Sequence, residues 1–227
     1  MTKKNDSSNH DTSPETFQKS KEQWLKEGNI LYEAKQYEEA LAAFDQAISL
    51  DPNDAMAYYT KGLVLRKLYK SEEALVVFEQ ATHLDPTNAA IYSAQVIPVM
   101  NLDRNEEALA ASDQAIRLDP HNTTYHYTKG VALYYFKRYE EAISAFEQAI
   151  RCDPQNSHAH HNKGTALSNL KRYEEALAAY QQAIVFSPTN AATWYSIGKT
   201  LEYLNRPKEA QEADRKAREL SGFAMNE

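Results

Sequence analysis

The chain has 227 residues, of which 42% are hydrophobic, and a formal net charge of −7. This length is enough for one or two folded domains, and scarce glycine with abundant Ala, Glu, Gln and Leu favours helix over sheet. A single cysteine, Cys152, excludes an internal disulfide scaffold. The sequence has no run of about 18 apolar residues, so no membrane span is predicted.

The charge pattern argues against one class of partner, nucleic acid. Lys and Arg form no basic run, so nucleic acid is not expected as a partner. The first residues also lack the apolar segment of a signal peptide, which favours a cytoplasmic location.

The N-terminal region divides into two expected segments. Residues 1–12 are polar and are expected to form a disordered tail. Ser13, Pro14 and Glu15 are typical of a helix start, and residues 13–20 are therefore expected to extend the first helix. The alternative is a loop up to about Thr16. At the other end, residues 223–227 are expected to form a short tail.

Residues 21–222 repeat with a period of 34. The prolines that keep this period are Pro52, Pro86, Pro120, Pro154 and Pro188. Glycine follows the same period at Gly28, Gly62, Gly130, Gly164 and Gly198. Such a period indicates a stack of similar supersecondary units. The units are 21–54, 55–88, 89–122, 123–156, 157–190 and 191–222, and positions within each are counted from 1.

Each unit is expected to contain two helices, A and B. The residue before helix A is a typical N-cap, and these residues are Asp54, Asn88, Asn122, Asn156 and Asn190. Helix B opens with paired glutamates, which suit the positive end of the helix dipole. Gly at position 8 and Ala at position 20 allow the two helices to approach closely, and an aromatic residue at position 24 fills space toward a neighbouring helix.

The period and its residues resemble a known family. The pattern W-x3-G-x2-L, A-x3-F, A-x4-P, with segments such as YEEALAAFDQAISLDPND, resembles the tetratricopeptide repeat. This resemblance implies an all-α, right-handed α-solenoid of six tandem helix-turn-helix repeats, with a concave groove lined by helix A.

Units three and six depart from the pattern. Unit three has Val96 at position 8, Pro98 at position 10 and Ser112 at position 24. A proline inside a helix costs about 3 kcal/mol, so we expect a kinked helix A that repacks over the space left by Ser112. This unit is either a soft joint in the array or the result of neutral drift. Unit six carries a polar helix B with Asp214 at position 24, as expected of a terminal cap.

The resemblance also implies a binding surface at positions 2, 5, 9, 12 and 13 of helix A. The candidate groove residues are Asn29, Tyr32, Tyr59, Arg66, Tyr127, Tyr134, Tyr135, His158, His161, Asn169, Tyr195, Lys199 and Tyr203. Tyrosine is a frequent residue at binding hot spots. The alternative is that these tyrosines pack between neighbouring helices.

Two more specific sites are not favoured. A carboxylate clamp for chaperone tails needs Lys, Asn and Arg at set positions; Asn29 fits, but Leu25 and Ser93 do not. His158 and His161 share a helix face at a spacing that can bind metal, yet a third ligand is lacking and Cys152 is expected in the core. No metal or cofactor is therefore expected.

The function expected from these patterns is a non-enzymatic adaptor that binds a protein or peptide in its groove. No phosphate loop or catalytic constellation stands out. The alternative is a structural or regulatory subunit of a larger complex that uses its convex or terminal faces. A metal-dependent or small-molecule enzyme is a third hypothesis, and it would use His158 and His161.

Overall fold

The fold is an array of helix pairs. The computed structural model describes residues 19–222, and within them the chain forms twelve α-helices and no strand, which confirms the expected all-α solenoid of helix-turn-helix repeats. The helices are α1 (Lys21–Glu33), α2 (Tyr37–Leu50), α3 (Ala55–Lys67), α4 (Ser71–Leu84), α5 (Ala89–Asn101), α6 (Asn105–Leu118), α7 (Thr123–Tyr135), α8 (Tyr139–Cys152), α9 (Ser157–Asn169), α10 (Tyr173–Phe186), α11 (Ala191–Tyr203) and α12 (Pro207–Leu220).

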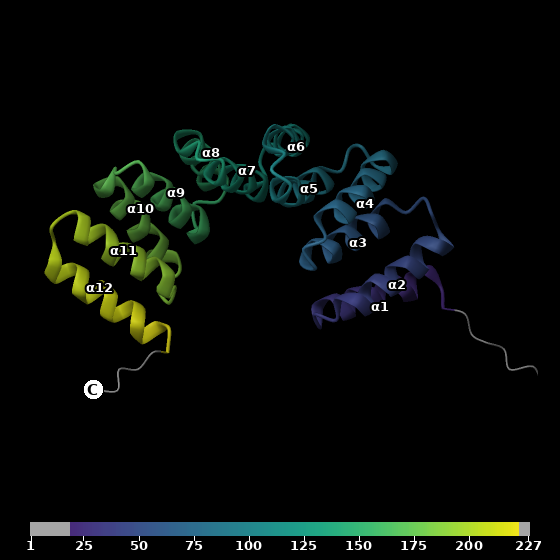
Figure 1. Cartoon of the computed structure of the whole chain (residues 1–227), viewed down its shortest axis with the longest axis horizontal. Helices are drawn as coiled ribbons and strands as arrows, with labels where there is room; N and C mark the ends of the chain where they lie inside the picture. Colours follow the sequence, from purple (N-terminus) through teal and green to yellow (C-terminus); the bar gives the residue numbers. More distant parts are fainter. Residues whose placement is uncertain (1–18, 223–227) are drawn as a thin grey trace, which may run out of the picture.

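The pairs follow one another around an arch (Figure 1), with α5 and α7 on its inner side and α6 and α8 on its outer side. Each odd-numbered helix is helix A of a unit and each even-numbered helix is its helix B. Every helix A after the first contacts helix B of the preceding unit, and it also contacts helix A of the preceding unit. Because of this stacking, the A helices form one continuous inner layer.

Side-chain caps define where the A helices begin. Asp54 and Asn88 accept hydrogen bonds from backbone N–H groups of the first turn of α3 and α5, and the equivalent asparagines cap α7, α9 and α11. The first helix is capped by Ser20, which forms a capping box with Gln23.

The expected helical extension over residues 13–20 is wrong at its described end. Ser20 has an extended backbone, with φ −73° and ψ 166°, so α1 begins at Lys21. The capping box explains this start, because it satisfies the free amides of the first turn and needs a non-helical cap residue. The remainder of that segment, the expected tail 1–12 and the tail 223–227 lie outside the described residues.

Each regular unit is held together by an aromatic ring on a glycine. The ring of Phe44 packs over Gly28, and a Cβ at residue 28 would lie 2.7 Å from Cε1 of Phe44. The same relation joins Gly62 to Phe78, Gly130 to Phe146 and Gly164 to Tyr180. Glycine is required here because its missing side chain is the space that the ring occupies. All of these aromatic rings are buried.

In unit three, different residues fill the space between helices A and B. Val96 and Ser112 take the places of the glycine and the ring, and both are buried. The Ser112 hydroxyl donates to the carbonyl of Ala108 at 2.9 Å, so it leaves no unpaired polar group in the core. Helix α5 runs through Pro98 with the same 13 residues as the other A helices. These features agree with the expected compensation between a larger residue at position 8 and a smaller one at position 24.

Unit six ends the array with a polar helix. In α12, Asp214 stands where other units have an aromatic ring, and its Oδ1 faces Gly198. That oxygen is buried and has no hydrogen-bond partner within the described part of the chain. Among residues 19–222, no helix has the length and apolar character needed to cross a bilayer.

Candidate functional site

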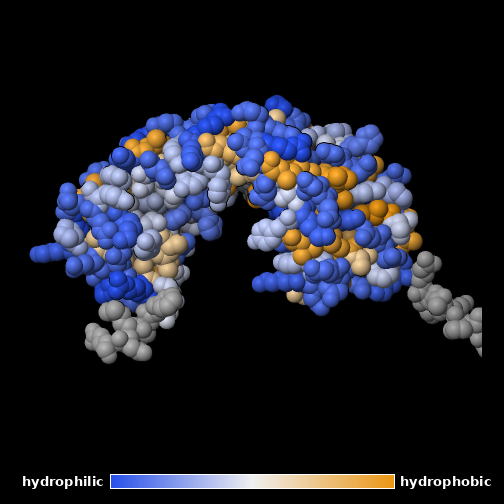
Figure 2. Space-filling model, in the orientation of Figure 1, coloured by the Kyte–Doolittle hydropathy of each residue, from blue (hydrophilic) through white to orange (hydrophobic). Residues whose placement is uncertain are grey.

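The candidate site is the concave surface of the arch, which we call the groove. The residues expected to line it are at positions 2, 5, 9, 12 and 13 of the A helices α1, α3, α5, α7, α9 and α11. Figure 2 shows apolar residues along the inner rim at the centre of the arch and on the limb formed by the first units. The opposite limb is mostly polar in this view.

A pocket of about 320 Å³ lies in the groove at units two to four. Its wall from α3 consists of Tyr59, Leu63 and Arg66. The α5 wall consists of Ala90, Ser93, Ala94 and Ile97, and the far wall consists of Asn122, Thr124, Tyr125 and Thr128. Unit three contributes small or aliphatic side chains here, which opens a hollow between the larger side chains of units two and four.

Tyr125 was not among the expected site residues. It occupies position 3, where Ala57, Ile91, Ala159 and Thr193 are buried against the preceding unit. Tyr125 is only partly buried and lines the pocket, and burial raises the pKa of its phenol. A tyrosine at a position otherwise held by smaller residues was the sequence signal that could have revealed it.

The expected site residues of unit two lie at this pocket. Tyr59 is partly buried, with its ring centroid 6.2 Å from that of Phe78. Arg66 is partly buried, and its guanidinium makes no hydrogen bond or ion pair with any residue of 19–222. In unit one, Asn29 is exposed, whereas Tyr32 packs against Tyr37 at 5.9 Å between centroids. Burial raises the pKa of Tyr32, and the nearby charge of Arg66 opposes that rise.

Two of the expected groove tyrosines of unit four, Tyr127 and Tyr134, make contacts within the protein. The Tyr127 ring lies 5.9 Å from Phe146, and its hydroxyl accepts a hydrogen bond from Asn162 at 2.8 Å. The Tyr134 hydroxyl accepts one from Asn169 at 3.2 Å. These bonds join unit four to unit five. Tyr135 differs, because 67% of it is exposed on the groove surface.

The histidines of unit five have structural contacts. His161 is partly buried, its ring lies 5.4 Å from that of Tyr180, and its Nδ1 is 3.0 Å from the Thr193 hydroxyl. Burial lowers the pKa of His161, and the neighbouring His158 lowers it further. His158 is exposed. In the described residues, no group of three His, Cys, Asp or Glu side chains is placed to hold a metal ion.

At position 4 of α5, α7, α9 and α11, a side chain bonds to the proline carbonyl of the turn before the helix. His126 Nε2 is 2.8 Å from the Pro120 carbonyl, and His160 Nε2 is 3.0 Å from that of Pro154. The Trp194 indole N–H donates to the equivalent Pro188 carbonyl at 2.8 Å. Through these contacts His126 and His160 hold their helices to the preceding turn.

The last unit presents two more exposed aromatic residues at expected groove positions. Tyr195 is 56% exposed, and the Lys199 ammonium lies 5.7 Å from its ring centroid. Lys199 also pairs with Glu202 at 2.9 Å, and this carboxylate raises the lysine pKa. Tyr203 is 62% exposed, with its ring stacked on Tyr173 at 4.7 Å.

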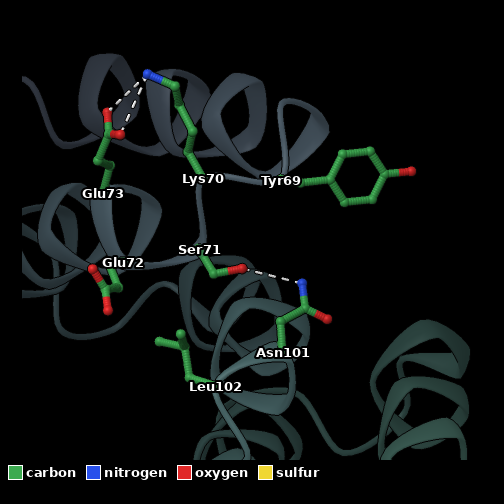
Figure 3. A pocket seen from close by; sticks show the side chains of 7 residues that line it. All are labelled: Tyr69, Lys70, Ser71, Glu72, Glu73, Asn101 and Leu102. Carbon is green, nitrogen blue, oxygen red and sulfur yellow. Dashed lines mark hydrogen bonds and ion pairs between the residues drawn. The ribbon is translucent and has the colours of Figure 1, made fainter.

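A second hollow lies at the edge of the arch (Figure 3), where the turn between α3 and α4 meets the end of α5. Asn101 donates to the Ser71 hydroxyl at 3.1 Å, and Lys70 pairs with Glu73 at 3.3 Å. Tyr69 points away from these residues and is 87% exposed. Most residues that line this hollow are polar, and Lys70 is paired with Glu73, so it offers less apolar surface to a partner than the groove pocket does.

Comparison with known sequences identifies the class of protein. A profile described as Tetratricopeptide repeat matches residues 99–157, 127–191 and 161–224, and another of that description matches residues 55–88. A profile described as TPR repeat matches residues 28–68. The chain therefore belongs to the tetratricopeptide repeat family. A comparison with curated proteins found no match.

Several solved structures of other proteins have the same fold. YrrB, described as a TPR protein with an unusual peptide-binding site, is 24% identical, with a TM-score of 0.61 over 79% of this chain and 93% of YrrB. PilW, described as a type IV pilus biogenesis factor, is 17% identical, with a TM-score of 0.81 over 90% of this chain and 94% of its own. MamA from Desulfovibrio magneticus RS-1 is 22% identical, with a TM-score of 0.66 over 74% and 96%. At these identities the likeness shows the fold alone.

Proposed function

We propose that this protein is a non-enzymatic adaptor that binds a peptide segment of a partner protein in its groove. The observation that carries this proposal is the pocket of about 320 Å³ at units two to four, open to the concave side and lined by Tyr59, Leu63 and Ile97. Ile97 is 37% exposed there. Partly exposed aromatic and aliphatic side chains on a preformed surface can bind a partner with little ordering cost.

Two further features support the proposal. Family membership supports a general role in protein interaction, and YrrB is described as having a peptide-binding site. The stacked A helices also hold the groove side chains on rigid elements rather than on loops. The exposed tyrosines Tyr135, Tyr195 and Tyr203 would extend the same surface toward unit six. The complete set of expected groove residues and the cytoplasmic location stay predictions.

The test compares two matched aliphatic-to-acid variants. Peptides are selected from a displayed random library on the wild-type protein, and their binding is then measured by fluorescence anisotropy. Ile97→Glu places a charge in the groove pocket, whereas Val76→Glu places one on α4 at a residue that is 61% exposed and outside the groove. We expect Ile97→Glu to weaken binding at least roughly tenfold and Val76→Glu to leave it unchanged. Equal binding by both variants would contradict the proposal.

A structural subunit that uses its terminal face is the second candidate function. A hollow of about 420 Å³ lies between α11 and α12, the last two described helices, and its lining includes Ala192, Tyr195 and Arg218. Peptides that lose binding in Arg218→Glu and keep it in Ile97→Glu would favour this face over the groove.

A further inference from the structure

Arg66 places a positive charge beside the apolar lining of the groove pocket. Among the other described arginines, glutamates pair with Arg104, Arg138, Arg172, Arg206 and Arg215, neutral glutamines bond to Arg117 and Arg151, and Arg218 also has a partner. Arg66 is partly buried beside the pocket, and its guanidinium has neither a hydrogen bond nor an ion pair within residues 19–222. A partly desolvated guanidinium without a counter-charge is costly, and a carboxylate can satisfy it with two parallel hydrogen bonds.

The surroundings of Arg66 contain no acid that could serve as its partner. No Asp or Glu lines the pocket, and the groove positions of units two and three carry Arg66 and Lys67 as their only formal charges. Glu33 in unit one is the nearest acidic groove residue in sequence order. It lies close enough to Tyr32 to influence that phenol, yet it forms no ion pair with Arg66. The pocket is therefore locally positive within a chain of net charge −7.

The apolar part of the pocket lies next to this charge. Leu63 is on the same helix as Arg66, and Ile97 and Ala94 lie on the adjacent helix α5. Tyr59 and Tyr125 flank the hollow on either side of α5. A ligand that fills it would place an apolar side chain on Leu63 and Ile97 while an acidic side chain reaches Arg66.

We propose that the groove pocket binds a partner segment in which an aspartate or glutamate side chain lies near a large apolar residue, with Arg66 pairing the carboxylate and Leu63 and Ile97 receiving the apolar group. This proposal rests on the proposed function and specifies the partner's chemistry. An internal acidic side chain fits better than a chain terminus, because Arg66 offers a single bidentate fork without the cluster of donors that a terminal clamp needs. Elsewhere on the acidic surface the same segment is repelled, so charge also contributes to specificity.

The test uses a defined set of probes. Fluorescein-labelled, C-terminally amidated Gly/Ser decapeptides carry one Leu or Phe and one Glu at every mutual spacing, and each has a twin with Gln in place of Glu. A further arm carries Gln in the middle and a free C-terminal carboxylate. Binding is measured by anisotropy at low ionic strength for wild type, Arg66→Gln, Arg151→Gln and Ile97→Glu. Arg151 is an exposed arginine on α8 that bonds only to Gln148, so it gives the same change of charge outside the groove.

We expect at least one Glu peptide to bind wild type roughly tenfold more tightly than its Gln twin, and Arg66→Gln to abolish that difference. Arg151→Gln keeps the difference. Because Arg66 has no partner to lose, its replacement leaves the urea unfolding curve unchanged, and this is measured alongside.

Each other outcome counts against the proposal in a distinguishable way. If Glu and Gln twins bind alike and Ile97→Glu abolishes both, the groove function stands and the acidic preference is wrong. If Arg66→Gln keeps the preference, another cation recognises the peptide. If only the free carboxylate arm gains affinity, the site binds a chain terminus instead. If no peptide binds, both this proposal and the proposed groove function are contradicted.

Discussion

The ring of Phe146 lies so close to Gly130 that a Cβ on residue 130 would be 2.6 Å from Cε1 of the ring. Real Cβ atoms do not approach other carbons so closely, so any side chain at residue 130 must displace the ring. The pair joins α7 to α8 and recurs in three other units with different residue numbers. Unit three carries the reversed pair, Val96 and Ser112, and both of these are also buried.

The reversed pair predicts strong coupling between the two positions. In unit four, Gly130→Val alone should destabilise the protein by about 1–3 kcal/mol through overpacking, and Phe146→Ser alone by about 3–5 kcal/mol through a cavity. The double variant reproduces the arrangement of unit three, so its loss should fall below the sum by about 1 kcal/mol or more. Urea unfolding of the four proteins measures this, and losses that simply add would show that the two positions are independent.

Pro98 is expected to reduce the stability of α5. Pro98→Ala restores an N–H that can donate to the Ala94 carbonyl. Units four and five already have a buried alanine at the equivalent position, Ala132 and Ala166. The gain of about 3 kcal/mol from removing an interior proline is offset by the loss of buried methylenes at about 0.8 kcal/mol each. We therefore expect a net gain of about 1 kcal/mol. The matched change Ala132→Pro should cost about 3 kcal/mol or more. A less stable Pro98→Ala protein would show that the proline ring contributes more by packing than it costs.

His161 predicts a pH dependence of stability. Burial, with His158 as a second cause, lowers the pKa of folded His161 below its usual value, so between the folded and unfolded pKa the unfolded chain binds more protons. The contribution of the neutral imidazole to the free energy of unfolding is thus fully present above about pH 6.5, and it is lost as the pH falls below that value.

The comparison for this pH effect is His161→Tyr, because Tyr59 and Tyr127 occupy the same position in other units. Urea unfolding at about pH 7.5 and about pH 5.5 should show a larger loss on acidification for wild type than for the variant. Equal losses would mean that His161 titrates normally in the folded protein. An NMR titration of its ring protons checks the direction of the pKa shift directly.

Asp214 predicts a stabilising substitution in the last unit. Its Oδ1 is buried without a partner opposite Gly198, where other units place an aromatic ring. Asp214→Phe should raise the free energy of unfolding by about 1–2 kcal/mol, because it removes an unsatisfied polar atom and adds apolar burial. Asp214→Asn keeps the shape without the charge and should recover less. A lower unfolding midpoint for Asp214→Phe would show that the carboxylate has a favourable role at this end of the array.

Much of the fold could be predicted because each unit repeats the same local chemistry. The N-cap residues, the glycine and aromatic positions and the polar last helix all carry their signals within one period. The start of α1 was misplaced because Ser20, with Gln23, competes with the earlier Ser13 signal, and a capping box is decided by backbone geometry.

Less of the site could be predicted because its contacts cross between units. Tyr127 is bonded to Asn162, which lies 35 residues away in the next unit, and no pattern within a unit shows that bond. The same limit applies to Arg66, whose lack of a partner depends on how α1, α3 and α5 are spaced. The periodic pattern therefore predicted a helix face for the groove, whereas the pocket and the unpaired guanidinium required the structure.

The measurement that tests the central claim most directly is paramagnetic broadening of the protein's amide NMR signals by a bound peptide that carries a nitroxide label. The peptide is the tightest of those selected on the wild-type protein. We predict that the broadened signals come from α3, α5 and α7, around the pocket lined by Tyr59, Arg66 and Ile97. Broadening confined to the outer helices α4, α6 and α8, or to α12 at the end of the array, would contradict the claim that the groove is the binding surface.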